Sequence, residues 1–92
     1  MTTLHLTLKK KWFDLIRSGV KTEEYREMKP YWDRRLMAGK EFDTVTFKNG
    51  YQKNAPTFVI ELKEIVSGLG ILEWGAPEAE PVYILKLGAI IG

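Results

Sequence analysis

The sequence predicts a small α+β domain in which about five or six strands form a β-barrel flanked by two short helices. Three observations lead to this prediction. The chain has 92 residues, enough for one domain and too few for two, so residues 1–92 form a single domain. Apolar residues at helical spacing occur only in the first forty residues. From residue 41 onward, apolar and polar residues alternate with the period of a strand.

The N-terminal segment predicts a strand followed by a helix. Residues 3–8 alternate strictly, with leucines on one face and polar residues on the other, which is typical of a half-buried strand. Apolar side chains at helical spacing then run from Trp12 to Ile16. Ser18 and Gly19 end this helix, because glycine readily adopts the left-handed conformation found after helix C-termini.

The next part of the chain predicts a second strand and a second helix. A threonine and a tyrosine favour an extended conformation for residues 21–27. Pro30 suits the first position of a helix, because its missing N–H has no partner there in any case. We expect this helix to run through residues 31–37 and to be closed by Gly39.

The second half of the chain predicts three strands, a tight turn and one long loop. Residues 44–48 alternate and are followed by Asn49-Gly50, a pair typical of tight turns. A second alternating run covers residues 58–66. Residues 73–81 predict an irregular loop. The almost wholly apolar run at residues 82–87 predicts a strand that is covered on both faces.

The composition excludes several kinds of site. The chain has no cysteine, which rules out disulfides, thiolate metal sites and cysteine nucleophiles. Its one histidine, His5, rules out any site that needs two imidazoles. No uncharged run is long enough to cross a bilayer and no secretory leader is visible, so we expect a cytoplasmic protein that does not bind membranes.

Neither a metal nor another cofactor is expected. Glu23, Glu24 and Glu27 offer the oxygen ligands that Mg²⁺ or Mn²⁺ prefers. On a strand, however, successive side chains point to opposite faces, so Glu24 would point away from the other two. We therefore predict no bound metal.

Basic residues are concentrated in the first part of the chain. Residues 1–40 contain ten lysines and arginines against five acids, whereas residues 41–92 contain four lysines against seven acids. The two parts carry +5 and −3, which sum to the formal net charge of +2. This distribution favours a cationic face and an anionic partner, although charges that fall unevenly on a solvated surface explain it equally well.

Three lysines stand at the start of the first helix, where acidic residues are favoured. A helix N-terminus carries partial positive charge and unpaired N–H donors, which makes Lys9, Lys10 and Lys11 unfavourable there. Gathered at one point, these groups would form a phosphate-binding corner, and Lys10 and Lys11 are the candidate ligand contacts. The alternative is that the lysines simply point into water.

The strand predicted at residues 21–27 has no apolar face. Glu24 and Arg26 lie two residues apart and therefore share a face. A paired strand in a small barrel turns one face inward, so such charges must be paired or bound to something. They form either a structural ion pair or a polar cleft with a fixed cation, a carboxylate and the nearby Lys21.

Around this strand the chain carries the pattern G-x-K-x-x-E-x-R, at Gly19, Lys21, Glu24 and Arg26. The pattern resembles the signature of the ASCH domain family, which is related to the PUA-like RNA-binding fold. The resemblance covers nearly the whole chain and includes Trp12–Gly19, Lys29–Trp32, Asn49–Tyr51 and Trp74–Pro77. It implies a PUA-like barrel beside a cleft in which the motif residues converge on nucleic acid or a modified nucleoside.

The activities of this family leave two functions open. Some members are RNA-binding modules, whereas others are nucleases or hydrolyse N4-acetylcytidine. In the amidohydrolase branch the motif lysine activates a threonine, and here Glu24 stands at the position of that threonine. If the protein is an enzyme, the resemblance makes Lys21 and Glu24 its catalytic residues, with Glu73 as a candidate for a later glutamate of the branch. A carboxylate does not readily replace a hydroxyl nucleophile, which weakens this alternative.

The leading hypothesis from the sequence is therefore binding of single-stranded RNA or a nucleotide, and the alternative is a small hydrolase of modified nucleosides or a ribonuclease. Lys21 would recognise an anion as a mobile charge and Arg26 as a planar donor fork. Trp74 is a candidate for stacking on a base, and capping one end of the barrel is its alternative role.

The apolar C-terminal tail suggests a third function, that of a protein-interaction module. Residues 87–92 are unusually apolar for a terminus and would suit a partner or a second copy of the chain. We favour instead a final strand that continues into the core. The expected oligomeric state is a monomer or a weak homodimer.

Overall fold

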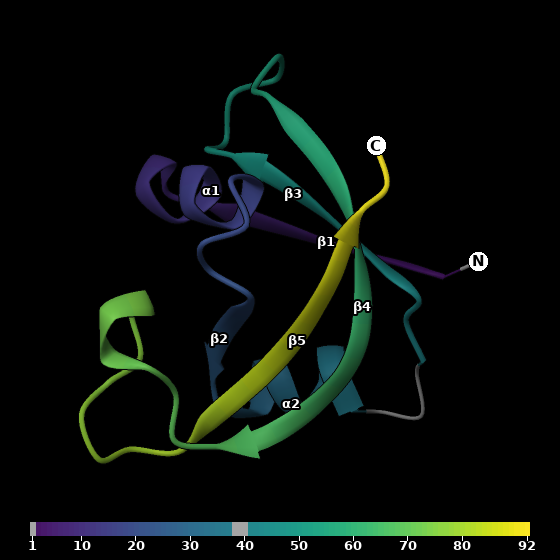
Figure 1. Cartoon of the computed structure of the whole chain (residues 1–92). Helices are drawn as coiled ribbons and strands as arrows, with labels where there is room; N and C mark the ends of the chain where they lie inside the picture. Colours follow the sequence, from purple (N-terminus) through teal and green to yellow (C-terminus); the bar gives the residue numbers. More distant parts are fainter. Residues whose placement is uncertain (1, 38–40) are drawn as a thin grey trace.

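The computed structural model describes residues 2–37 and 41–92, which form one curled sheet with two helices (Figure 1). The elements in chain order are β1 (Thr3–Leu8), α1 (Lys10–Arg17), β2 (Glu23–Glu27), α2 (Pro30–Met37), β3 (Thr44–Asn49), β4 (Thr57–Gly68), the short 3-10 helix η1 (Leu72–Trp74) and β5 (Val82–Ile90). The strand order is β1-β3-β4-β5-β2, with β1 and β3 parallel and the other pairs antiparallel. This half-barrel with two short helices confirms the predicted α+β class.

The interior of the half-barrel is filled by the apolar faces of the strands and of α1. The leucines of β1 face inward, as their alternation predicts. Three rings, which we call the phenylalanine cluster, pack at the centre: Phe58 lies between Phe13 and Phe47, with ring centroids 4.9 and 5.7 Å away. Val82–Leu85 are all buried, which confirms that this end of β5 is covered on both faces.

The helices end close to where the sequence predicts. α1 ends at Arg17, and Gly19 follows with a φ of +86°, in the left-handed conformation expected after a helix. The predicted closing residue of α2, Gly39, lies outside the described residues. The loop predicted as irregular begins with η1, and β4 extends to Gly68, beyond its predicted end at residue 66. No helix within the described ranges has the length and apolar character needed to span a membrane.

The C-terminal tail belongs to the sheet. β5 continues to Ile90, and the N–H groups of Ile91 and Gly92 donate to the carbonyl oxygen of Val59 at 2.8 and 3.2 Å. This confirms the expectation that the tail continues the last strand. The side chains of Ile90 and Ile91 are nevertheless exposed, so the tail does not extend the core.

The edge strands β1 and β2 face each other across a seam. Arginines of β2 and α2 donate hydrogen bonds to β1 there. Arg26 of β2 donates from Nη2 to the carbonyl oxygen of Thr7 in β1 at 3.2 Å. Arg35 of α2 donates from Nη2 to the carbonyl oxygen of His5. Because carbonyl groups on an edge strand lack a partner within the sheet, these contacts satisfy part of the β1 edge. The charged face of β2 thus meets β1 at this seam.

Candidate functional site

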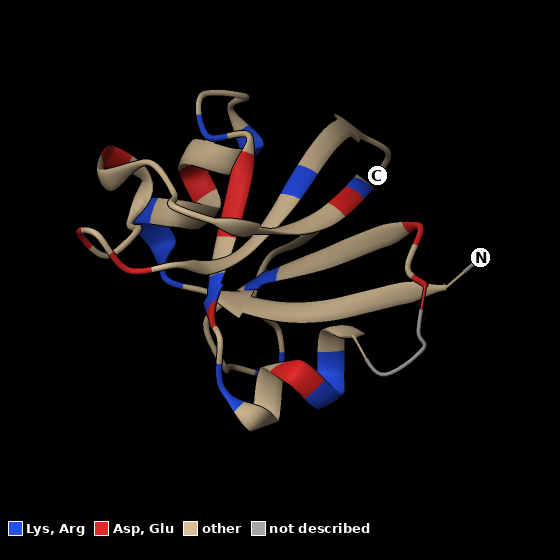
Figure 2. Cartoon of the chain, turned by 90° about the horizontal axis from the view of Figure 1, so that it is seen from below, with Lys and Arg blue, Asp and Glu red and all other residues tan. Residues whose placement is uncertain are grey.

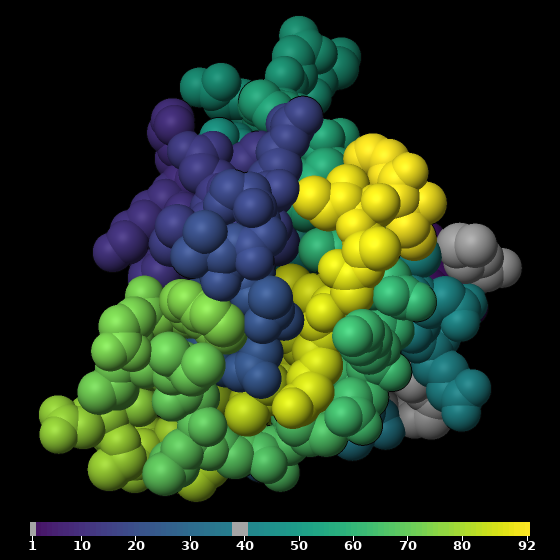
Figure 3. Space-filling model, in the orientation of Figure 1, coloured from purple at the N-terminus to yellow at the C-terminus, as the bar shows by residue number. Residues whose placement is uncertain are grey.

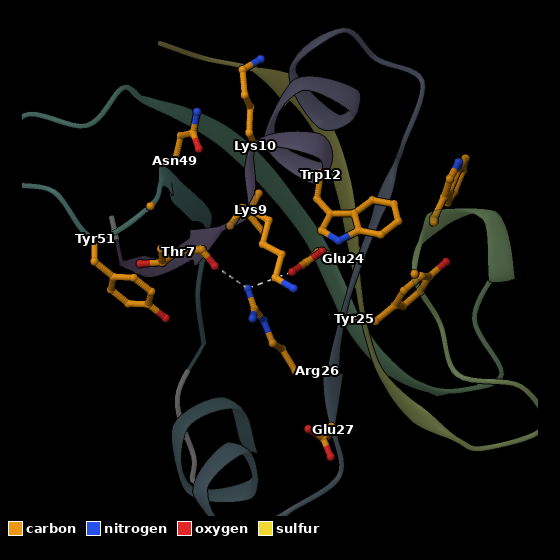
Figure 4. A pocket seen from close by; sticks show the side chains of 14 residues that line it. Thr7, Lys9, Lys10, Trp12, Glu24, Tyr25, Arg26, Glu27, Asn49 and Tyr51 are labelled. Carbon is orange, nitrogen blue, oxygen red and sulfur yellow. Dashed lines mark hydrogen bonds and ion pairs between the residues drawn. The ribbon is translucent and has the colours of Figure 1, made fainter.

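A cavity of about 800 Å³ opens along the β1–β2 seam, and we call it the Arg26 cavity (Figure 4). Its volume lies within the roughly 300–1,000 Å³ that is typical of small-ligand sites. It is lined by the end of β1 with the start of α1, by β2, by the turn after β3 and by the end of η1. The lining residues are Thr7, Leu8, Lys9, Lys10, Trp12, Glu24, Tyr25, Arg26, Glu27, Asn49, Gly50, Tyr51, Trp74 and Gly75.

Glu24 and Arg26 present their charged groups on the same face of β2, as their spacing predicts. Arg26 Nη2 lies 2.8 Å from Glu24 Oε2, and the other carboxylate oxygen, Oε1, lies 3.3 Å from Lys21 Nζ. Glu24 therefore joins two cations. The ion pair that the sequence left open is formed, and its two members, Glu24 and Arg26, are also part of the cavity wall.

Arg26 is held in place from several sides (Figure 4). Besides its contacts with Glu24 and with the backbone of β1, its guanidinium lies over the ring of Trp32, 5.1 Å from the centroid. Its Nε is buried and has no hydrogen-bond partner among the described residues. The side chain is still 19% exposed, so a fixed cation remains accessible from the cavity. A cation held in this way loses little further freedom when an anion binds.

Lys21 does not line the Arg26 cavity. Its side chain is 0% exposed, and its Nζ donates to the carbonyl oxygen of Trp74 at 2.8 Å. The ammonium also lies over the rings of Tyr25 and Trp12, 4.6 and 5.3 Å from their centroids. The prediction that Lys21 is a mobile charge in the cleft is therefore wrong. Burial lowers the pKa of Lys21, and the neighbouring Glu24 carboxylate opposes this shift only in part.

Two of the three lysines at the start of α1 line the cavity, and only one of them was a predicted contact. Lys10 lines the cavity, whereas Lys11 lies over the ring of Trp12, 4.7 Å from the centroid, and does not. Lys9 takes the place predicted for Lys11, and its side chain points toward the ion pair of β2 (Figure 4). Its backbone is still extended, so Lys9 continues the strand face of Thr7. The two-residue spacing of Thr7 and Lys9 was therefore a signal in the sequence that Lys9 shares a face with Thr7.

Aromatic side chains form much of the remaining wall. Trp74 is half-buried and lines the cavity, where a base could stack on it. Trp12 lines the cavity as well, although helical spacing assigned it to the apolar face of the first helix. Sequence reasoning missed this second role because Trp12 also packs against the core. Tyr51, in the turn after β3, is 90% exposed at the cavity.

The loop between β4 and β5, which we call the η1 loop (residues 69–81), packs tightly beside β2 (Figure 3). Gly75 has a φ of +97°, and a Cβ at this position would lie 2.9 Å from Cζ2 of Trp12. A Cβ at Gly70 would lie 2.7 Å from Cε1 of Tyr25. The N–H of Ile71 donates to the Tyr25 hydroxyl at 3.0 Å, and that hydroxyl donates to a carboxylate of β2 at 2.8 Å. Burial raises the pKa of Tyr25 to about 12.

The acidic residues near the site do not converge. Glu24 and Glu27 both line the cavity, but Glu27 pairs with a neighbouring lysine at 2.8 Å, and Glu23 pairs with a lysine of β5 at 3.7 Å. The parts of the chain that the structure describes contain no group of three His, Asp or Glu residues placed to hold a metal ion. Glu73 is exposed on the η1 loop, which carries acidic but no basic residues (Figure 2), and it does not line the cavity.

No family model matches this chain, and neither a curated protein nor a solved structure matches it. The resemblance of the G-x-K-x-x-E-x-R pattern to the ASCH family therefore remains a hypothesis.

Proposed function

We propose that the protein is an ASCH-like domain that binds single-stranded RNA or a nucleotide in the Arg26 cavity. The composition of the cavity wall carries this proposal. Three cations, Lys9, Lys10 and Arg26, stand beside the rings of Trp12 and Trp74. Cationic side chains form charge-assisted hydrogen bonds with phosphate, and a base stacked on an aromatic ring gains roughly 1–3 kcal/mol.

Each part of the wall has a distinct role in this proposal. Arg26 offers a fixed planar donor, whereas Lys9 and Lys10 are flexible point charges that suit a variable phosphate backbone. Glu24 orients Arg26 through their 2.8 Å contact. A carboxylate oxygen of Glu24 that faces the cavity can also accept a hydrogen bond from the exocyclic amine of a base. The resemblance to the ASCH family supports the same class of ligand.

The proposal is tested by titrating a short single-stranded RNA against the protein and following tryptophan fluorescence at two salt concentrations. We expect salt-dependent binding that weakens in Lys9→Ala. This variant should lower the slope of log affinity against log salt by about 0.7, which corresponds to one phosphate contact on a single strand. The matched control is Lys63→Ala, which removes an exposed lysine that does not line the Arg26 cavity. Absence of binding, or equal effects of the two variants, would contradict the proposal.

Hydrolysis is the second candidate, and the fixed position of Glu24 favours it. One carboxylate oxygen is held by the Lys21 ammonium and the other by Arg26, so the group is oriented at the cavity wall. An oriented carboxylate can accept a proton from water. Incubation with N4-acetylcytidine and with end-labelled RNA, with and without Mn²⁺, separates the two functions. If the protein converts one of these substrates and Glu24→Gln does not, the function is hydrolysis. If the substrates stay intact, the result supports binding alone.

A further inference from the structure

The buried ammonium of Lys21 contacts three segments that are far apart in the sequence. It lies over the ring of Trp12 in α1, pairs with Glu24 and lies over the ring of Tyr25 in β2, and donates to the carbonyl oxygen of Trp74 in the η1 loop. No part of its side chain reaches solvent. This lysine thus makes its contacts inside the protein, next to a cavity whose lining includes all four of the residues it contacts.

We infer that Lys21 is a positioning residue, whose buried ammonium holds the η1 loop against β2 and thereby sets the place of Trp74 in the wall of the Arg26 cavity. The effect of Lys21 on RNA binding rests on the proposed function, whereas its effect on the position of the η1 loop does not. The role differs from both roles considered from the sequence, because Lys21 neither contacts the ligand nor takes part in a reaction.

A side chain with several N–H donors suits this position because two acceptors, one of them a carboxylate oxygen, face it. The Trp74 carbonyl oxygen and Glu24 Oε1 lie 2.8 and 3.3 Å from Nζ. An ammonium has three donors and serves both at once, whereas an apolar side chain of the same length would leave both acceptors without a partner. The rings of Trp12 and Tyr25 replace part of the water that the ammonium loses on burial.

The η1 turn is compact, so its backbone and the Trp74 side chain move together. Three hydrogen bonds close it: the N–H of Trp74 and the N–H of Ala76 donate to the carbonyl oxygen of Ile71 at 3.0 and 3.2 Å, and the N–H of Gly75 donates to that of Leu72 at 3.0 Å. Among the described residues, two polar contacts hold this turn, one at each end, from β2 and from the segment just before it. Tyr25 holds the end at Ile71, and Lys21 holds the end at Trp74.

The inference is tested without RNA by fluorine NMR of protein labelled with 5-fluorotryptophan. The chain has three tryptophans, so three signals are expected, each assigned by a Trp→Phe variant. In Lys21→Met we expect the Trp74 signal to broaden and to show a larger shift between H₂O and D₂O, which reports greater exposure. The Trp32 signal should not change. In the control Lys63→Met, all three signals should keep their wild-type values.

Lys21→Met leaves Glu24 with one cation fewer and can unfold the protein for that reason alone. The charge-matched variant Lys21→Met/Glu24→Gln removes both members of the pair and should show the same change at Trp74. A Trp74 signal that stays as in the wild type in either folded variant would overturn the inference.

A double-mutant cycle then connects the loop to RNA. Trp74→Ala removes the ring but keeps the backbone carbonyl that Lys21 holds. We expect that adding Lys21→Met to Glu24→Gln weakens RNA binding by roughly 5- to 150-fold relative to Glu24→Gln alone, which corresponds to loss of one base-stacking contact. Adding Lys21→Met to the variant Glu24→Gln/Trp74→Ala should have no further effect. A full effect in both backgrounds would show that Lys21 acts other than through Trp74. If the wild type binds no RNA, the proposed function fails, and the NMR result still decides the role of Lys21.

Discussion

The phenylalanine cluster and the Arg26 cavity lie in the same half-barrel and are stabilised in opposite ways. In the cluster, Phe58 packs against two rings at 4.9 and 5.7 Å, and the contacts have little directional preference beyond ring geometry. At the cavity, Glu24 has one oxygen on Lys21 and the other on Arg26. Each of these three charges has a named partner, because an unpaired buried ion would be strongly unfavourable.

The difference shows which part of the molecule is available for function. In the phenylalanine cluster, the rings gain their stabilisation by contact with one another. They offer no polar group that could bind a ligand. At the seam, other groups of the protein satisfy only part of the hydrogen-bonding capacity. The Nε of Arg26 has no partner among the described residues, and Lys9 points into the cavity. Apolar packing is therefore concentrated in one region, and polar groups open to further contacts lie in the other.

The largest expected effect is on the stability of the apolar region. Phe47 is completely buried, and Phe47→Ala should lower the free energy of unfolding by about 3–5 kcal/mol, through lost burial and the cavity left behind. Urea unfolding followed by circular dichroism measures this change. RNA affinity of the folded fraction should stay as in the wild type. A weaker RNA affinity at full folding would mean that the two regions are not separable.

A smaller loss is expected at the seam. Glu24→Ala leaves the buried Lys21 without its carboxylate, and it should cost about 2–3 kcal/mol, less than the roughly 3–5 kcal/mol of a fully buried pair, because Arg26 keeps contact with solvent. The variant Lys21→Met/Glu24→Gln should lose less than Glu24→Ala, since it leaves no buried ammonium, and Arg26, which loses its carboxylate in both variants, still reaches solvent. Urea unfolding of both variants compares them directly, and the opposite ranking would contradict the role of charge pairing.

The smallest expected effect is a pH dependence of the free energy of unfolding that arises from Lys21 beside the seam and not from the phenylalanine cluster. The pKa of Lys21 is lower in the folded protein than its ordinary value of 10.5, so the unfolded chain binds this proton more tightly. The free energy of unfolding should therefore rise with pH between the lowered pKa and 10.5, relative to Lys21→Met. Urea unfolding across this range measures the difference. A difference that falls with pH would mean that pairing with Glu24 outweighs burial; Phe47→Ala should show no such trend relative to the wild type.

Much of the fold follows from local patterns in the sequence. The alternation of residues 3–8 placed the leucines of β1 on the buried face, and Gly19 ends α1 with a positive φ as predicted. The shared face of Glu24 and Arg26 was also visible, because parity along a strand needs no knowledge of the rest of the chain.

The sequence by itself therefore determined the main strands and helices, much of the core and the shared face of Glu24 and Arg26 on β2. Only the tertiary structure decided which charges remain accessible: Lys21 is enclosed because the η1 loop, more than fifty residues later in the chain, covers it, and Lys9 faces the cavity. The physical reason is that periodicity reports which face of an element is apolar, whereas the exposure of a charged group depends on what distant segments place over it. Trp12 shows the same limit, since one ring packs on the core and also lines the cavity.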